Sequence, residues 1–178
     1  MTDLSQPTLS LMPPDELPPS GSTVKPVAFL WPTPPYASYP EPTAPPAGEA
    51  CDIEGPNGQV MRGRLILFLP EEQMVQVQLP PSRTTWPLRF NEFRALTLQR
   101  PLRPDSGVEH GPRAEVLRQR PRSLAHVTYA DGREEVSETI GHVETAFGLF
   151  LFPPIDASDA VRRVFTPRPA YRARARAS

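Results

Sequence analysis

Proline is the residue that most constrains what this chain can fold into. The sequence has 178 residues, of which 26 are proline and 10 are glycine. Proline fixes φ and lacks a backbone N–H, so it interrupts helices and is kept out of central strands. We therefore expect a mainly β protein with short strands. It is expected to comprise two small tandem β-barrel or meander modules that follow a disordered, proline-rich N-terminal leader.

The leader is assigned to residues 1–49, which hold 13 of the prolines and few aliphatic residues. Such a composition buries too little apolar surface to offset the entropy of ordering, so disorder with polyproline II character is expected. One stretch differs, because Val27 to Trp31 is apolar and Pro34-Pro35-Tyr36 follows closely. Either this stretch packs along the rim of the next domain, or it is a proline-plus-aromatic docking peptide for the groove of a partner.

The first β module is assigned to residues 50–99, with strands at 52–54, 60–68, 74–79, 86–90 and 95–98. Val75 and Val77 alternate with Gln76 and Gln78 at the period of a strand. Asn57-Gly58 predicts a hairpin, because this pair accepts the positive φ angles of a type I′ turn.

A proline-rich hinge at 100–122 follows, in which 112–120 has the pattern of a short helix with proline at its first position. The second β module is assigned to 123–168, with strands at 126–129, 139–143, 148–152 and 163–165. From Gly58 to Leu79, which precedes a proline pair, is 21 residues, and from Gly132 to Phe152, which precedes another, is 20. This spacing favours two related modules. The alternative is that any two short-strand segments with such turns would align equally well.

Residues 169–178 are expected to be a disordered basic tail, since Arg and Ala alternate there without a core-forming pattern. A basic arm for nucleic acid or anionic lipid is the functional alternative, although four arginines in the last eleven residues are few for that purpose. The net charge of −1 divides into −4 for residues 1–99 and +3 for residues 100–178. No overall field therefore steers nucleic acid to the chain, and we expect no nucleic-acid partner.

The basic residues and the single cysteine exclude several chemistries. Lys25 is the only lysine, and no Gly-Lys-Ser/Thr tripeptide is present, so the chain has no P-loop of its own. Cys51 alone can form neither an intrachain disulfide nor a thiolate zinc site. No apolar run reaches the ~20 residues that a bilayer requires. We expect a cytoplasmic protein without membrane insertion.

No residue pattern indicates catalysis, and we expect no enzyme activity, no metal site and no cofactor. His110, His126 and His142 are spaced 16 residues apart, which is no metal-ligand spacing on a helix. Ser137 and His142 could meet on adjacent strands, but so could many other pairs. No catalytic residue is assigned.

Arg118 and Arg122 form an Arg-x-x-x-Arg pair just before the second module, and their guanidinium groups could hold phosphates. This pair resembles the start of PilZ domains, β-barrels that bind cyclic di-GMP. The companion Asp/Asn-x-Ser-x-x-Gly motif of that family is matched imperfectly by residues 135–141, which have Glu135 in place of Asp and Gly141 one position late. Binding of cyclic di-GMP is accordingly the alternative function.

Three other segments resemble the non-catalytic N-terminal region of ATPases of the type II secretion and type IV pilus assembly family. They are Trp31-Pro32-Thr33-Pro34-Pro35-Tyr36, residues 87–98, and residues 141–144 with 148–154. The resemblance covers residues 27–171 and carries over no catalytic residue, because the nucleotide-binding elements of that family would follow Ser178. It implies a form that lacks the motor domain, either truncated or frameshifted.

The expected function is therefore a non-enzymatic binding or regulatory module of a bacterial secretion or pilus machine, with a protein as its partner. Trp31, Tyr36 and Trp86 are the candidate contact residues, and we expect Trp31 and Trp86 to be exposed. Rigid aromatic side chains supply much of the binding energy at small interfaces.

Overall fold

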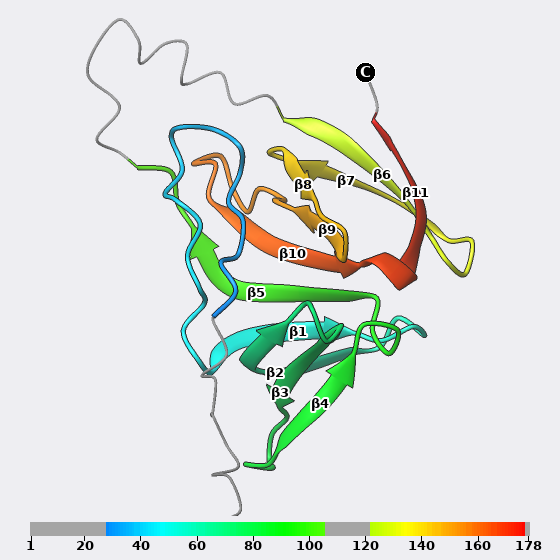
Figure 1. Ribbon diagram of the computed structural model, residues 1–178. Helices are drawn as coiled ribbons and strands as arrows, with labels where there is room; N and C mark the ends of the chain where they lie inside the picture. The colour runs from blue at the N-terminus through cyan, green and yellow to red at the C-terminus, as the bar shows by residue number, and fades with distance from the viewer. Residues whose placement is uncertain (1–27, 106–121, 177–178) are drawn as a thin grey trace, which may run out of the picture.

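The computed structural model describes residues 28–105 and 122–176, and both ranges consist almost entirely of strands and turns (Figure 1). The prediction of a mainly β protein is confirmed. The short helix predicted at 112–120 lies outside the described residues. The strands are β1 (Glu49–Glu54), β2 (Val60–Leu69), β3 (Met74–Gln78), β4 (Thr85–Arg89), β5 (Ala95–Leu102), β6 (Ser123–Tyr129), β7 (Glu134–Thr139), β8 (His142–Glu144), β9 (Gly148–Leu151), β10 (Val161–Pro167) and β11 (Tyr171–Arg176).

The two described ranges pair their strands in the same order. In the first, β1 pairs with β2, β2 with β3 and β3 with β4, and β5 returns to β1. In the second, β6 pairs with β7, β8 with β9 and β9 with β10, and β11 returns to β6. β7 and β8 together take the place of β2, and they are separated by a bend at Gly141, whose φ is +77°.

A strand pair between the two halves joins them into one sheet. β5 pairs antiparallel with β10, which gives an eight-stranded sheet of order β4-β3-β2-β1-β5-β10-β9-β8. A three-stranded sheet of order β11-β6-β7 lies over β8, β9 and β10 (Figure 1). The described strands form no closed barrel, and the two expected modules share a sheet, so separate barrels joined only by a hinge are not what the structure shows.

The disorder predicted for the leader is wrong for residues 28–49, while residues 1–27 lie outside the described part of the chain. Trp31 is completely buried, and its backbone N–H donates to the carbonyl of Thr43 at 3.0 Å. The hydroxyl of Tyr39 donates to the carbonyl of Asp159 at 2.6 Å. The stretch around Trp31 therefore packs into the following domain, and it does so at the core rather than at the rim.

The disorder predicted for the tail at 169–178 is also wrong up to Arg176. A three-residue 3-10 helix (Arg168–Ala170) leads into β11, which pairs with β6. Tyr171, the first residue of β11, is buried against Val127 and Leu149 in the smaller of two hydrophobic clusters. The alternation of Tyr, Arg and Ala from 171 to 176 has the period of a strand, and pairing with β6 gives its backbone the partners that a strand needs.

One aromatic cluster forms the larger core. All eight phenylalanines of the chain belong to it, six buried and two half-buried, and Trp31 completes it. The rings of Phe68 and Phe150 each lie 4.9 Å from the ring of Phe165. Strands from both halves and the segment around Trp31 thus share one core, and aromatic pairs at such distances add to the free energy of simple burial.

Candidate functional site

The hairpin turns between β1 and β2 and between β6 and β7 have the same local structure. Gly58 and Gly132 have φ angles of +82° and +87°, and each donates its N–H to the carbonyl three residues earlier, at 2.9 Å and 3.0 Å. The side chains of Asn57 and Asp131 each accept a hydrogen bond from the N–H two residues ahead, at 3.1 Å and 3.0 Å. Asn57 does not share the positive φ of Gly58. The type I′ prediction is therefore wrong, and the turn is a type I turn followed by a left-handed glycine.

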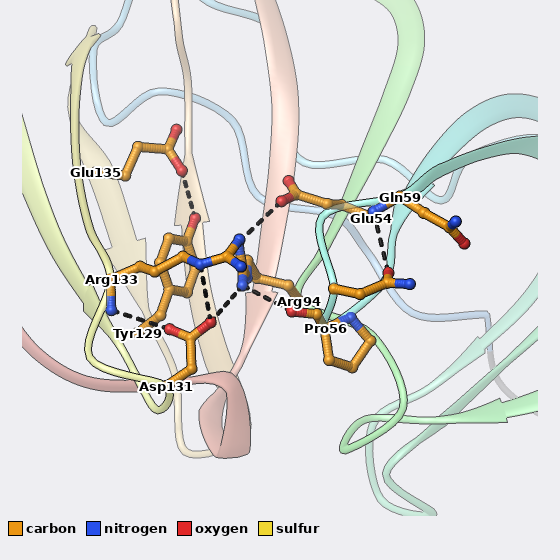
Figure 2. A network of polar contacts seen from close by, with 9 residues as sticks. Glu54, Pro56, Gln59, Arg94, Tyr129, Asp131, Arg133 and Glu135 are labelled. Carbon is orange, nitrogen blue, oxygen red and sulfur yellow. Dashed lines mark hydrogen bonds and ion pairs between the residues drawn. The ribbon is translucent and has the colours of Figure 1, made fainter.

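Arg94 connects these two turns (Figure 2). It lies immediately before β5, and its side chain is only 8% exposed. One guanidinium nitrogen donates to Glu54 at 3.1 Å, and the other donates to the carbonyl of Pro56 at 2.8 Å and to the carboxylate of Asp131 at 2.6 Å. We call Arg94, Glu54, Pro56 and Asp131 the Arg94 junction.

Aromatic and charged groups surround the Arg94 junction. The Arg94 guanidinium lies over the ring of Tyr129, 4.6 Å from its centroid, which is a cation–π geometry. The hydroxyl of Tyr129 donates to Glu135 at 2.6 Å (Figure 2). Burial, followed by the bond to Glu135, raises the pKa of Tyr129 above its ordinary value. The hydrogen bond from the backbone N–H of Arg133, and secondarily the charge of Arg94, lower the pKa of Asp131.

The Arg94 junction braces the two turns against each other. Both terminal nitrogens of Arg94 already hold acceptors from the two turns. The adjacent pocket has a volume of about 150 Å³ and is mostly apolar, with Phe93, Tyr129 and Pro169 among its walls. Among the described residues that line this pocket there is no serine, cysteine or histidine.

The structure separates the three aromatic residues expected to contact a partner. Trp31 is buried in the core, so its expected exposure is wrong: its indole fills the space between Phe68 and Phe150. Tyr36 is half-buried, and its ring lies beside Gly141. Trp86 is 55% exposed on β4, as predicted.

The Arg118 and Arg122 pair is described at one position only, because Arg118 lies outside the described residues. Arg122 donates to Asp159 at 2.8 Å and to the carbonyl of Asp156 at 3.0 Å, and it forms an ion pair with Glu138 at 3.4 Å. The hydrogen bond to Asp159 is the main reason why the pKa of Arg122 is raised. Its guanidinium thus has protein acceptors in Asp156, Asp159 and Glu138, and the side chain is 34% exposed.

The residues considered for catalysis do not converge. Ser137 pairs with Ala125 in the three-stranded sheet, whereas His142 pairs with Leu151 in the eight-stranded sheet. His126 is half-buried on β6, and His110 lies outside the described residues. Within 28–105 and 122–176, no group of three His, Cys, Asp or Glu side chains could hold a metal ion. The same ranges contain no helix with the length and hydropathy needed to cross a membrane.

Sequence reasoning missed Arg94, and no local pattern would have revealed it. Arg94 is a single arginine in a turn, and its acidic partners Glu54 and Asp131 are 40 and 37 residues away. The one available signal was the matching Asn57-Gly58 and Asp131-Gly132 turns, which gave no hint of a shared partner. Comparisons with protein-family models, with curated proteins and with solved structures found no match to this chain.

Proposed function

We propose that this chain is a non-enzymatic binding module that holds a protein partner through the surface around Trp86. The observation that carries the proposal is the contrast among its aromatic side chains. The phenylalanines and Trp31 are gathered in the core, whereas more than half of the Trp86 side chain is exposed. An exposed indole is a typical anchor of a protein interface, because it brings a large apolar area at little cost in conformational entropy.

The position of Trp86 supports docking through side chains. β4 is an edge strand of the eight-stranded sheet, so one side of its backbone has no neighbouring strand in the described sheet. Pro87 follows Trp86 and removes one backbone donor from this strand. Proline on an edge strand opposes the addition of a further strand, so we infer that the partner contacts the indole rather than extending the sheet.

We further propose that the partner belongs to a bacterial secretion or pilus assembly machine, and that the chain acts as the non-catalytic N-terminal region of such an ATPase does. The support is the resemblance of residues 31–36, 87–98 and 141–154 to the N-terminal region of that family. Segment 87–98 includes the residue next to Trp86, so the candidate contact borders a segment that carries the resemblance. A cytoplasmic location, inferred from the single Cys51, belongs to the same proposal.

We also propose that the two halves are related modules placed edge to edge. The common order of strand pairing and the matching turns at Gly58 and Gly132 support this relation. On this basis the second module extends through β11 instead of ending at residue 168.

The proposal is tested with purified chain and with the secretion and pilus assembly ATPases of the source organism, by biolayer interferometry. We expect binding by one of them, and we expect Trp86→Ala to weaken it about 10-fold or more, as the loss of a hot-spot aromatic does. Val136→Ala is the matched control, since Val136 is 52% exposed on the other sheet. Absence of binding, or equal affinities of the two variants, would contradict the proposal. A parallel titration with cyclic di-GMP tests the alternative function. If the chain binds this nucleotide, Arg122→Ala should abolish the binding.

A further inference from the structure

A polar cavity lies between the segment Thr43–Pro46, the first residue of β1, the end of β5 and the start of β10. It has a volume of about 550 Å³. Its polar walls include Glu49, Arg100, Arg103 and Arg163. We call it the arginine cleft. This volume is within the range of about 300–1,000 Å³ that small-molecule sites occupy.

Strand register brings three of these side chains to one face. Leu98 of β5 pairs with Cys51 of β1 on one side and with Arg163 of β10 on the other. Glu49 precedes Cys51 by two residues and Arg100 follows Leu98 by two, so both share the face of Arg163 because side chains alternate along a strand. Aromatic side chains cover the middle of this face of the sheet. At its end, next to Thr43–Pro46, the face carries charged side chains instead.

The inner wall of the arginine cleft holds a buried ion pair with unused hydrogen-bonding capacity. Arg163 lies 3.1 Å from Glu49, and their side chains are 6% and 4% exposed. Only one nitrogen of Arg163 and one oxygen of Glu49 are used in this contact. Among the described residues, Arg163 Nε and Glu49 Oε2 have no hydrogen-bond partner. Buried polar atoms without partners are rare in folded proteins and call for an explanation, and a bound ligand is one.

The charges of the arginine cleft favour an anion. Three arginines and one glutamate leave an excess of two positive charges. Arg100 and Arg103 are exposed at the rim, and Arg100 acts electrostatically on both members of the buried pair. Pro45, Pro101 and Leu102 give the remaining wall an apolar character.

We propose that the arginine cleft binds a small molecule that bears a phosphate group, independently of the protein partner proposed above. Arg100 and Arg103 hold the phosphate at the rim, Arg163 Nε donates to it from inside, and the apolar wall contacts the rest of the molecule. Guanidinium groups match phosphate oxygens in geometry, and a phosphate dianion balances the excess charge, which a single carboxylate would not do.

The test is isothermal titration of the full chain with inorganic phosphate and with AMP, at constant ionic strength set by potassium chloride. We expect Arg100→Gln and Arg103→Gln each to weaken phosphate binding about 10-fold, since each removes a charge-assisted hydrogen bond. Both residues are exposed, so these variants retain the fold. Arg62→Gln is the control, because Arg62 is exposed on β2 and is absent from the cleft.

Tighter binding of AMP than of inorganic phosphate would show that the apolar wall contributes, and equal binding would show that the phosphate group alone is recognised. Both results support the site, provided that Arg62→Gln binds like the unchanged protein. The proposal is overturned if neither probe binds at millimolar concentration. It is also overturned if Arg62→Gln weakens binding as much as Arg100→Gln, since that result indicates unspecific attraction to positive charge.

Discussion

Arg94 and Asp131 come from different halves of the chain, and the guanidinium of Arg94 donates to the carboxylate of Asp131 at 2.6 Å. The same guanidinium holds the carbonyl of Pro56 in the turn of the first half. One buried side chain therefore fixes the position of one hairpin relative to the other.

Arg94→Met is expected to lower the free energy of unfolding by about 3 kcal/mol, because it leaves Glu54 and Asp131 without their shared cation. Urea denaturation measures this change. Arg133→Met is the control, because Arg133 approaches Asp131 only to 3.5 Å and is 59% exposed. Removal of an exposed ion pair costs about 0.5 kcal/mol or less. Similar losses in the two variants would show that the Arg94 junction does not brace the turns.

Trp31→Ala is expected to lower the free energy of unfolding by about 4 kcal/mol, the usual cost of truncating a large buried aromatic side chain. The indole packs against Phe68 and Phe150 at ring distances of 5.2 Å and 5.3 Å, so its loss opens a cavity in the core. Trp86→Ala should change stability by about 0.5 kcal/mol or less, as surface substitutions do. If both variants are as stable as the unchanged protein, the segment around Trp31 is not part of the core.

Cys51 is expected to resist thiol reagents in the folded protein. Its side chain is buried, and burial, aided by Asp52 and Glu49, raises the pKa of the thiol to about 12. Only the thiolate reacts, so the rate with Ellman's reagent at pH 8 should be about 1,000-fold or more slower than in urea. Thr84→Cys adds an exposed thiol that should react quickly in the folded protein and thereby serve as the control. Rapid reaction of Cys51 without denaturant would contradict the burial.

Stability is expected to depend on pH through Glu49. Burial raises the pKa of Glu49, although Arg163 and Arg100 oppose the shift. Because the folded state binds this proton more tightly than the unfolded state, the contribution is fully present below about pH 4.3 and is lost as the pH rises through the raised pKa. The unchanged protein should therefore lose stability relative to Glu49→Gln as the pH rises from 4 to 7. Urea denaturation at a series of pH values measures the difference, and a constant difference would contradict the shift.

The sequence allowed prediction of the strands whose pattern is local. Val75 and Val77 alternate with glutamine because one face of β3 is buried, and β3 was predicted within one residue of its end. The positions of Gly58 and Gly132 in hairpin turns were equally predictable, since both need a positive φ. The exact turn type was not, because it depends on the φ of Asn57 as well.

Burial set by distant partners could not be predicted. Trp31 is followed closely by prolines in the sequence, and the rings against which it packs, Phe68 and Phe150, are more than thirty positions away. Arg162 and Arg163 look alike in the sequence, yet a shift of register between Val161 and Arg163 accompanies an exposed Arg162 and a buried Arg163. Long-range pairing of this kind leaves no periodic pattern of apolar residues in the sequence.

The ladder between β5 and β10 has a mechanical consequence. It makes the backbone hydrogen bonds continuous from β4 at one edge of the larger sheet to β8 at the other. A force applied by a partner at Trp86 is therefore carried across the hydrogen-bonded strands, and the halves can separate only if the β5–β10 hydrogen bonds break. Under tension the two halves should therefore move together as one rigid body.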